Sequence, residues 1–177
     1  MIYGILIALG LILIIPLFIK KEYSVVREIL IDKPKFWVFG YIKFLENQDN
    51  FSVWASLDPD MKKGMKGVDG TAGCISSWES THKNVGCGEQ EIIKIIEGER
   101  IDYELRFLKP FKSISQAFFI TEALTNNKTN VKWGFNGKMN YPMNIMLLFM
   151  NMEKMIGKDF ENGLARLKTL LEQQDDY

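Results

Sequence analysis

Residues 100–107 have the sequence RIDYELRF, in which apolar and charged side chains alternate strictly. Such alternation is typical of a β-strand with one face buried and the other in water. Similar β-rich runs flank this segment, at residues 23–31, 74–80, 89–96, 114–123 and 131–135. Turn signals at 81–86 and 126–128 separate neighbouring runs. The sequence therefore predicts six or seven short strands, paired in succession into a curved antiparallel sheet.

Two helical regions accompany the predicted strands. Asp32, Lys33 and Pro34 form a cap and a helix-opening proline before the apolar run KFWVFGYI, and residues 51–56 add one more turn. A much longer amphipathic helix is predicted from Pro142 to about Gln173. Its single apolar stripe consists of Phe149, Met152, Ile156, Phe160, Leu164, Leu167 and Leu171. One long C-terminal helix over a curved antiparallel sheet predicts an α+β grip with an internal cavity.

The N-terminal segment is predicted to be a membrane anchor. Ile2 to Ile19 are 18 uncharged residues, which as a helix span about 27 Å, close to the thickness of a bilayer's hydrocarbon core. No small-residue cleavage site follows, so we interpret the run as an uncleaved, single-pass transmembrane helix. Lys20 and Lys21 come next, and the positive-inside rule then predicts a cytoplasmic domain. The predicted organisation is a transmembrane anchor at 1–19, a short linker at 20–22 and one domain at 23–177.

The charge balance argues against nucleic acid as a partner. The 177 residues contain 22 Lys and Arg against 22 Asp and Glu, and 47% of them are apolar. These values are ordinary for a folded domain, and no Lys/Arg run is longer than two. The two cysteines, Cys74 and Cys87, are predicted to lie too far apart for a disulfide, which fits a reducing compartment.

Five short strings carry a resemblance to a known superfamily. They are IDKPKFWVFGYI at 31–42, AGCISSWES at 72–80, NVGCGEQEI at 84–92, VKWGFNGKM at 131–139 and KDFENGLARLKTLLE at 158–172. From Tyr23 to about Glu172 the chain resembles the START-like, or SRPBCC, superfamily, in particular its polyketide cyclase/dehydrase and lipid transport branch. The resemblance implies a helix-grip fold whose elongated cavity holds hydrophobic ligands such as lipids, sterols or polyketides. The superfamily shares no single catalytic motif, so no catalytic residue is implied.

Nine side chains are predicted to line the cavity and contact a ligand, because they lie on elements whose inner faces would share one space. They are Trp54, Trp78, Tyr103, Leu105, Phe107, Trp133, Phe135, Met146 and Met150. Plain core packing is the alternative for the aromatic rings and for the methionines gathered at 139–155. His82, the one histidine, falls in a predicted turn, and Cys87 is expected to be a small buried residue. No catalytic residue, metal site or cofactor is predicted.

Three functions are compatible with these features, and we favour the first. It is a membrane-anchored domain that binds a lipid or another hydrophobic small molecule, with residues 139–150 forming a cavity rim that faces the bilayer. The second is an enzyme of the cyclase or dehydratase kind, which requires polar groups converging inside the cavity. The third is an interaction module that docks an unidentified protein through an exposed apolar face.

Overall fold

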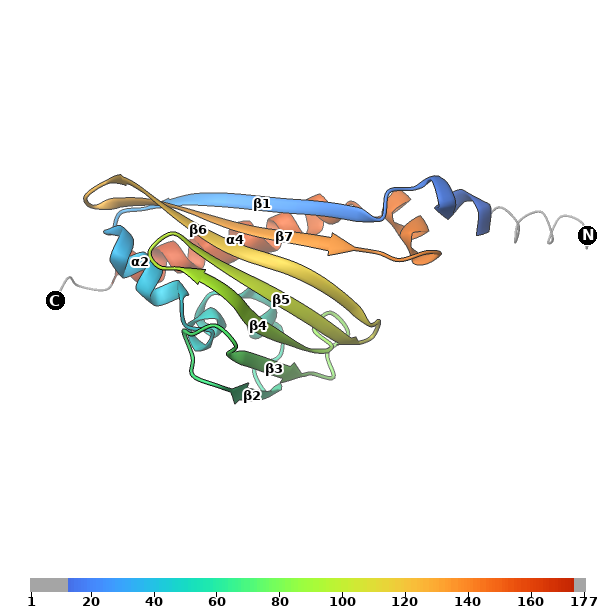
Figure 1. The fold of residues 1–177 in the computed structure, drawn as a ribbon, viewed down its shortest axis with the longest axis horizontal. Helices are drawn as coiled ribbons and strands as arrows, with labels where there is room; N and C mark the ends of the chain where they lie inside the picture. The colour runs from blue at the N-terminus through green and yellow to red at the C-terminus, as the bar shows by residue number, and fades with distance from the viewer. Residues whose placement is uncertain (1–12, 174–177) are drawn as a thin grey trace, which may run out of the picture.

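The computed structural model describes residues 13–173, which form a curved antiparallel sheet with helices packed on one face (Figure 1). The seven strands are β1 (Glu22–Ile31), β2 (Lys62–Lys66), β3 (Ile75–Glu79), β4 (Cys87–Ile96), β5 (Arg100–Lys109), β6 (Ser113–Thr125) and β7 (Lys128–Lys138). They are hydrogen-bonded in the order β1-β7-β6-β5-β4-β3-β2. The first and last strands are therefore neighbours, and the predicted antiparallel sheet of six or seven strands is confirmed.

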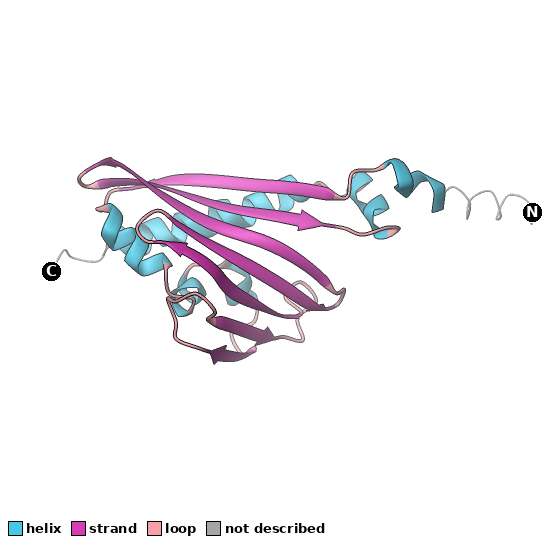
Figure 2. Ribbon diagram, viewed as in Figure 1, coloured by secondary structure: helices cyan, strands magenta, loops and turns pink. Residues whose placement is uncertain are grey.

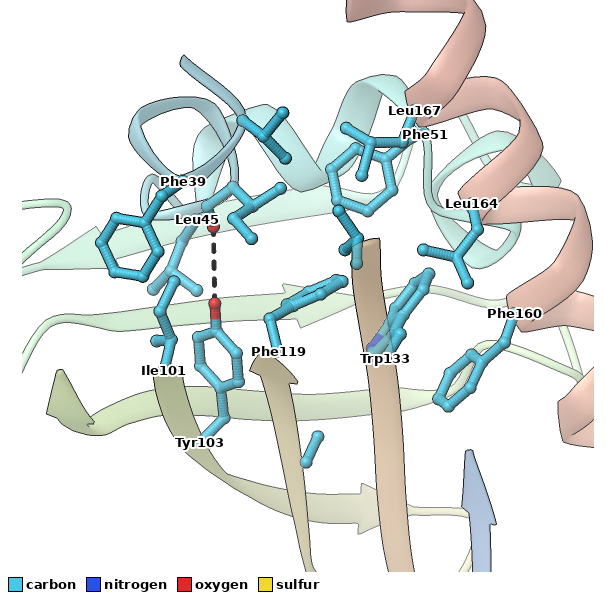
Figure 3. Packing of buried hydrophobic residues seen from close by; sticks show 14 of the residues in the cluster. Phe39, Leu45, Phe51, Ile101, Tyr103, Phe119, Trp133, Phe160, Leu164 and Leu167 are labelled. Atoms are coloured by element: carbon cyan, nitrogen blue, oxygen red, sulfur yellow. Dashed lines mark hydrogen bonds between the residues drawn. The ribbon is translucent and has the colours of Figure 1, made fainter. Parts of the chain in front are cut away.

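Several short helices and one long helix, α4, complete the described part of the chain. They are η1 (Ile15–Phe18), α2 (Lys35–Ile42), η2 (Glu46–Asn50), α3 (Val53–Leu57), η3 (Met143–Leu148) and α4 (Met152–Glu172), where η marks a 3-10 helix. The segment α2–η2–α3 connects β1 to β2, and α4 packs along β1 (Figure 2). Side chains of these helices and of the central strands meet in one core (Figure 3). The predicted α+β grip is confirmed.

On β5, the central strand, buried and outward-facing side chains alternate as the sequence predicts. Tyr103 on β5 is 2% exposed and faces the helices, whereas Arg106 lies on the opposite face. There the guanidinium forms ion pairs with Glu89, Glu91 and Glu104 at 2.5, 2.8 and 2.7 Å. The hydrogen bonds that Arg106 donates to these carboxylates raise its pKa, and the bond to Glu104 has the largest effect. Cross-strand charge pairs thus occupy the outer face of the sheet and leave the inner face apolar.

Aromatic rings fill the space between the sheet and the helices. Trp133 of β7 stacks on Phe160 of α4 with ring centroids 4.3 Å apart, and on Phe119 of β6 at 4.9 Å. Phe51 meets the Trp133 ring edge-on at 5.7 Å. The helix approaches this closely because residue 163 is glycine, where a Cβ would lie 2.8 Å from Cζ3 of Trp133. Each ring pair is worth about 0.5–1.5 kcal/mol beyond its buried area.

The single helix predicted from Pro142 is wrong, because the structure divides it into η3 and α4. Asn151 caps the N-terminus of α4 by accepting a hydrogen bond from the Lys154 N–H at 2.9 Å. Phe149, predicted on the apolar stripe, is 83% exposed in the intervening segment. The stripe from Phe160 onward is buried as predicted. The break lets η3 pack against η1 instead of continuing the line of α4.

Residues 1–12, which hold most of the predicted transmembrane helix, and residues 174–177 lie outside the described part of the chain. The described part begins at Leu13, just before η1, in which Pro16 is buried. Among residues 13–173, no helix combines the length and the apolar character that crossing a bilayer requires. The first strand begins at Glu22, one residue earlier than predicted.

Candidate functional site

A cavity of about 610 Å³ lies between the inner face of the sheet and the helical layer. This volume is in the range typical of small-molecule sites. The nine side chains predicted to contact a ligand all line it: Trp54, Trp78, Tyr103, Leu105, Phe107, Trp133, Phe135, Met146 and Met150. The structure therefore brings the predicted set together around one space, and their contact with a ligand stays a prediction.

Trp133 has the properties of both a core residue and a cavity wall. Its ring is 6% exposed and stacked on two neighbours, yet it also lines the cavity. Beside it, Tyr23 of β1 lies across β7, because its partner Gly137 has no side chain. A Cβ at Gly137 would lie 2.2 Å from Cζ of Tyr23. The Tyr23 ring therefore joins the wall next to Phe135, with centroids 6.1 Å apart.

Methionines form a second part of the wall. Of the six methionines among residues 13–173 that line it, Met61 precedes β2, and the other five come from the segment between β7 and the first turn of α4: Met139, Met143, Met146, Met150 and Met152. Unbranched thioether side chains repack around irregular shapes at low cost. This wall is therefore suited to apolar ligands of variable shape.

A small polar group of residues lies on the opposite wall. The Tyr103 hydroxyl donates a long hydrogen bond of 3.5 Å to the Ile42 carbonyl (Figure 3), and burial raises the pKa of Tyr103. Gln90 Nε2 donates to Gln48 Oε1 at 3.2 Å. Gln48 Nε2 is buried and has no hydrogen-bond partner among residues 13–173. A buried unpaired donor costs about 1–3 kcal/mol, so Gln48 Nε2 is a candidate donor to a polar atom inside the cavity.

Exposed lysines line the cavity where β5 ends and β6 begins, and we call this end the mouth. They are Lys83 in the β3–β4 loop, Lys109 at the end of β5, Lys112 in the β5–β6 loop and Lys138 at the end of β7. Phe111, which lies in the same loop and also lines the cavity, is 65% exposed. An amphipathic rim therefore surrounds an apolar interior.

Sequence reasoning missed the mouth and the Gln48–Gln90 pair. The four lysines are spread over more than fifty positions, and acids elsewhere balance them in the total charge. The string KPFK at 109–112, between two predicted strands, was the available signal for a basic and aromatic loop. No pattern marked Gln48, since its position depends on how η2 packs against β4.

The other residues considered for chemistry lie apart from the cavity interior. His82 is in the β3–β4 loop, where its Nδ1 accepts a hydrogen bond from the Asn84 N–H at 3.3 Å. Cys74 and Cys87 are both free and buried, and burial raises the pKa of the Cys74 thiol. In the part of the chain that the structure describes, no group of three or more His, Cys, Asp and Glu side chains could hold a metal ion.

Comparison with known proteins identifies the fold. No protein-family model and no curated protein matches this chain. Among solved structures, protein MLL2253 from Mesorhizobium loti matches with a TM-score of 0.62 at 13% identity, over 87% of this chain and 100% of that one. Aha1 from Colwellia psychrerythraea, described as a dimer, gives 0.60 at 12% identity, over 87% and 99% of the two chains. Ara h 8.0201 gives 0.58 at 12% identity, over 86% and 99%.

The chain has a helix-grip fold. Its structural neighbours have the same curved antiparallel sheet. At 12–13% identity this similarity establishes the architecture, and the function has to be argued from the cavity itself.

Proposed function

We propose that this protein is a membrane-anchored domain that binds a lipid or another hydrophobic small molecule in its cavity. The observation that carries the proposal is the cavity of about 610 Å³ with its wall of aromatic rings and methionines. Burial of apolar ligand surface contributes about 25 cal/mol per Å². Such a wall can therefore hold an apolar molecule without a metal or a covalent bond. The sequence resemblance to the lipid transport branch of the superfamily supports the same function.

The ionisable groups of the cavity favour binding over proton transfer. Burial raises the pKa of both Tyr23 and Tyr103, so each phenol holds its proton at neutral pH. Asp49 is the one carboxylate that lines the cavity within residues 13–173, and it is paired with Lys63 at 2.8 Å. General acid–base catalysis works best with a group whose pKa lies near the operating pH. Neither phenol provides one.

The position of the N-terminal segment supports membrane attachment beside the mouth. Leu13, Leu17 and Phe18 are 51%, 64% and 84% exposed, a cost that contact with lipid would remove. Asn144 of η3 holds this segment by donating hydrogen bonds to the carbonyls of Pro16 and Ile19 at 2.7 and 3.0 Å. In our proposal residues 2–19 cross the bilayer, and Lys20 and Lys21 keep the domain on the cytoplasmic side.

Mass spectrometry of organic extracts from gently purified full-length protein tests the binding function. We expect an apolar molecule to copurify with the wild-type chain. Ala117 lies on the inner face of β6, opposite Tyr103 and Phe135 on the flanking strands, so Ala117→Phe places a ring inside the cavity. Ala123 is exposed on the same strand, and Ala123→Phe is the matched control.

The two variants decide the result. The copurified molecule should be lost from Ala117→Phe and kept by Ala123→Phe, with circular dichroism confirming that both variants are folded. Equal amounts in all three proteins would show that the molecule binds elsewhere, for example as annular lipid. No copurified molecule, together with no uptake of added fatty acid, would contradict the proposal.

A further inference from the structure

The charges around the cavity are strongly unbalanced, although the chain as a whole has a net charge of zero. Five lysines and one carboxylate line the cavity, and that carboxylate, Asp49, is already paired with Lys63. At the mouth, Lys138 is 3.7 Å from Glu22. Within residues 13–173, Lys83, Lys109 and Lys112 form no ion pair with a carboxylate. Three positive charges at the mouth are therefore left without an anionic partner.

These three lysines come from loops that lie side by side. Cys87 of β4 pairs with Lys109 of β5, and a Cβ at Gly86 would lie 2.2 Å from the Lys109 carbonyl oxygen. The β3–β4 loop that carries Lys83 is therefore in contact with the start of the β5–β6 loop that carries Lys112. The three lysines therefore lie on neighbouring segments at one end of the cavity.

From these lysines the cavity leads along a largely apolar row of side chains on the inner face of β5. Phe107, Leu105 and Tyr103 follow Lys109 on the inner face, and all line the cavity. The strand rises about 20 Å between Lys109 and Tyr103. Lysine side chains pack their stems on apolar surface and keep the ammonium group in water. Positive charge at the entrance and an apolar path of this length form a binding site with two chemically different ends.

We infer that the cavity takes an anionic amphiphile, whose acidic group is held at the mouth by Lys83, Lys109 and Lys112 while its hydrocarbon chain extends inward toward Tyr103. The inference rests on the proposed function and specifies the class of ligand. A neutral molecule of the same length would fill the apolar path and leave the three charges unpaired. Carboxylate and phosphate head groups share the required chemistry, and the experiment below separates them.

Photo-crosslinking in vesicles tests the inference on the full-length chain. The vesicles consist of zwitterionic phosphatidylcholine, so the bilayer adds no net charge. Three probes share one hydrocarbon chain with a diazirine near its end: a fatty acid, its methyl ester and an alkyl phosphate. Peptide mapping then measures how much of each probe reacts with the peptides that contain Tyr103 and Trp133. Ala117→Phe gives the background for probe outside the cavity.

The variant is the triple change Lys83→Gln, Lys109→Gln and Lys112→Gln. Its matched control is Lys62→Gln, Lys66→Gln and Lys94→Gln, which removes the same charge at exposed positions that do not line the cavity. We expect the acid-to-ester crosslinking ratio to fall by about fivefold in the mouth variant and to stay within about twofold in the control, as three exposed charge pairs allow.

The outcomes separate this inference from the proposed function. If the ratio of fatty-acid to ester crosslinking is the higher one, the ligand is a carboxylate. If the ratio of alkyl-phosphate to ester crosslinking is the higher one, the ligand has a phosphate head group. Either result supports the inference if the mouth variant lowers that ratio. Equal crosslinking of acid, phosphate and ester, or a ratio unchanged by the mouth variant, overturns the inference and leaves hydrophobic binding intact. The lysines would then serve the bilayer surface instead. Crosslinking no higher than in Ala117→Phe for any probe contradicts the proposed function itself.

Discussion

Replacing Trp133 by alanine should damage both stability and binding, because the same ring serves the core and the cavity wall. The ring is 6% exposed and stacks on Phe119 and Phe160 at 4.9 and 4.3 Å. Truncation of a buried tryptophan costs about 3–5 kcal/mol through lost contacts and the space left behind. Trp133 lies toward the upper end of this range, because two stacked pairs and an edge contact with Phe51 are lost together.

Urea titrations followed by far-ultraviolet circular dichroism measure this loss, since tryptophan emission itself changes in the variant. The matched control is Trp37→Ala, because Trp37 on α2 is 41% exposed and should cost less than about 1 kcal/mol. Affinity for a fluorescent fatty acid should fall with Trp133→Ala and stay unchanged with Trp37→Ala. A loss of stability below about 2 kcal/mol would refute the packing described here. Unchanged affinity together with a large loss of stability would assign Trp133 to the core alone.

Two further predictions concern pH and orientation. Burial raises the pKa of Asp159, so the folded state binds a proton at this carboxylate more tightly than the unfolded state does. The stability of the folded state therefore falls as the pH rises above the ordinary aspartate pKa of about 4. Asp159→Asn should therefore raise the urea midpoint at pH 7 and leave it unchanged at pH 3; an equal effect at both would exclude titration as the cause. A spin label at Phe149, 83% exposed beside η1, should contact lipid in vesicles, whereas one at Leu124, 55% exposed near the β6–β7 turn, should contact water. Water contact at both positions would contradict the proposed membrane-facing rim.

The strands could be predicted from the sequence because their inner and outer faces differ so clearly in chemistry. On β5 the alternation of Tyr103 and Leu105 with Glu104 and Arg106 leaves one possible orientation, and the structure adopts it. A shift of one residue would bury the charged set. The same alternation predicted which aromatic side chains of the strands face the cavity. Local pattern was therefore sufficient for six of the seven strands and for most of the cavity wall, whereas the exposed edge strand β2, with the sequence KKGMK, shows no alternation and was not among the predicted runs.

The break before α4 depends on competition that periodicity does not show. Residues 145–150 are apolar on every side and continue the spacing of the following helix, so sequence alone favours one long helix. In the structure Asn151 caps α4, and Asn144 bonds to carbonyls of the N-terminal segment instead. The hydrogen bond from Asn144 to the Pro16 carbonyl joins positions 128 residues apart, and no local signal reports it. The exposed position of Phe149 follows from the same break.

The strand order explains why the N-terminal segment, the methionine wall and the lysine mouth occupy one end of the molecule. In an antiparallel sheet each connection alternates between two ends. Because Glu22 pairs with Lys138, the start of β1 lies beside the end of β7. The β3–β4 and β5–β6 loops, which carry Lys83 and Lys112, fall at that same end by the register of the remaining strands. The β4–β5 turn, with Glu97 and Glu99, falls at the opposite end.

The mouth lysines therefore lie at the end of the sheet from which the N-terminal segment leaves. Lys20 and Lys21 directly precede β1 and therefore lie at the same end as the mouth lysines. A basic cluster near a membrane is attracted to anionic lipids by about 1 kcal/mol per residue within a Debye length. Under the proposed function, neighbouring lysines serve two purposes. Lys20 and Lys21 orient the domain on the bilayer, and the mouth lysines hold the acidic group of the ligand. An anionic amphiphile leaving the membrane would therefore meet positive charge at every step before its chain enters the cavity.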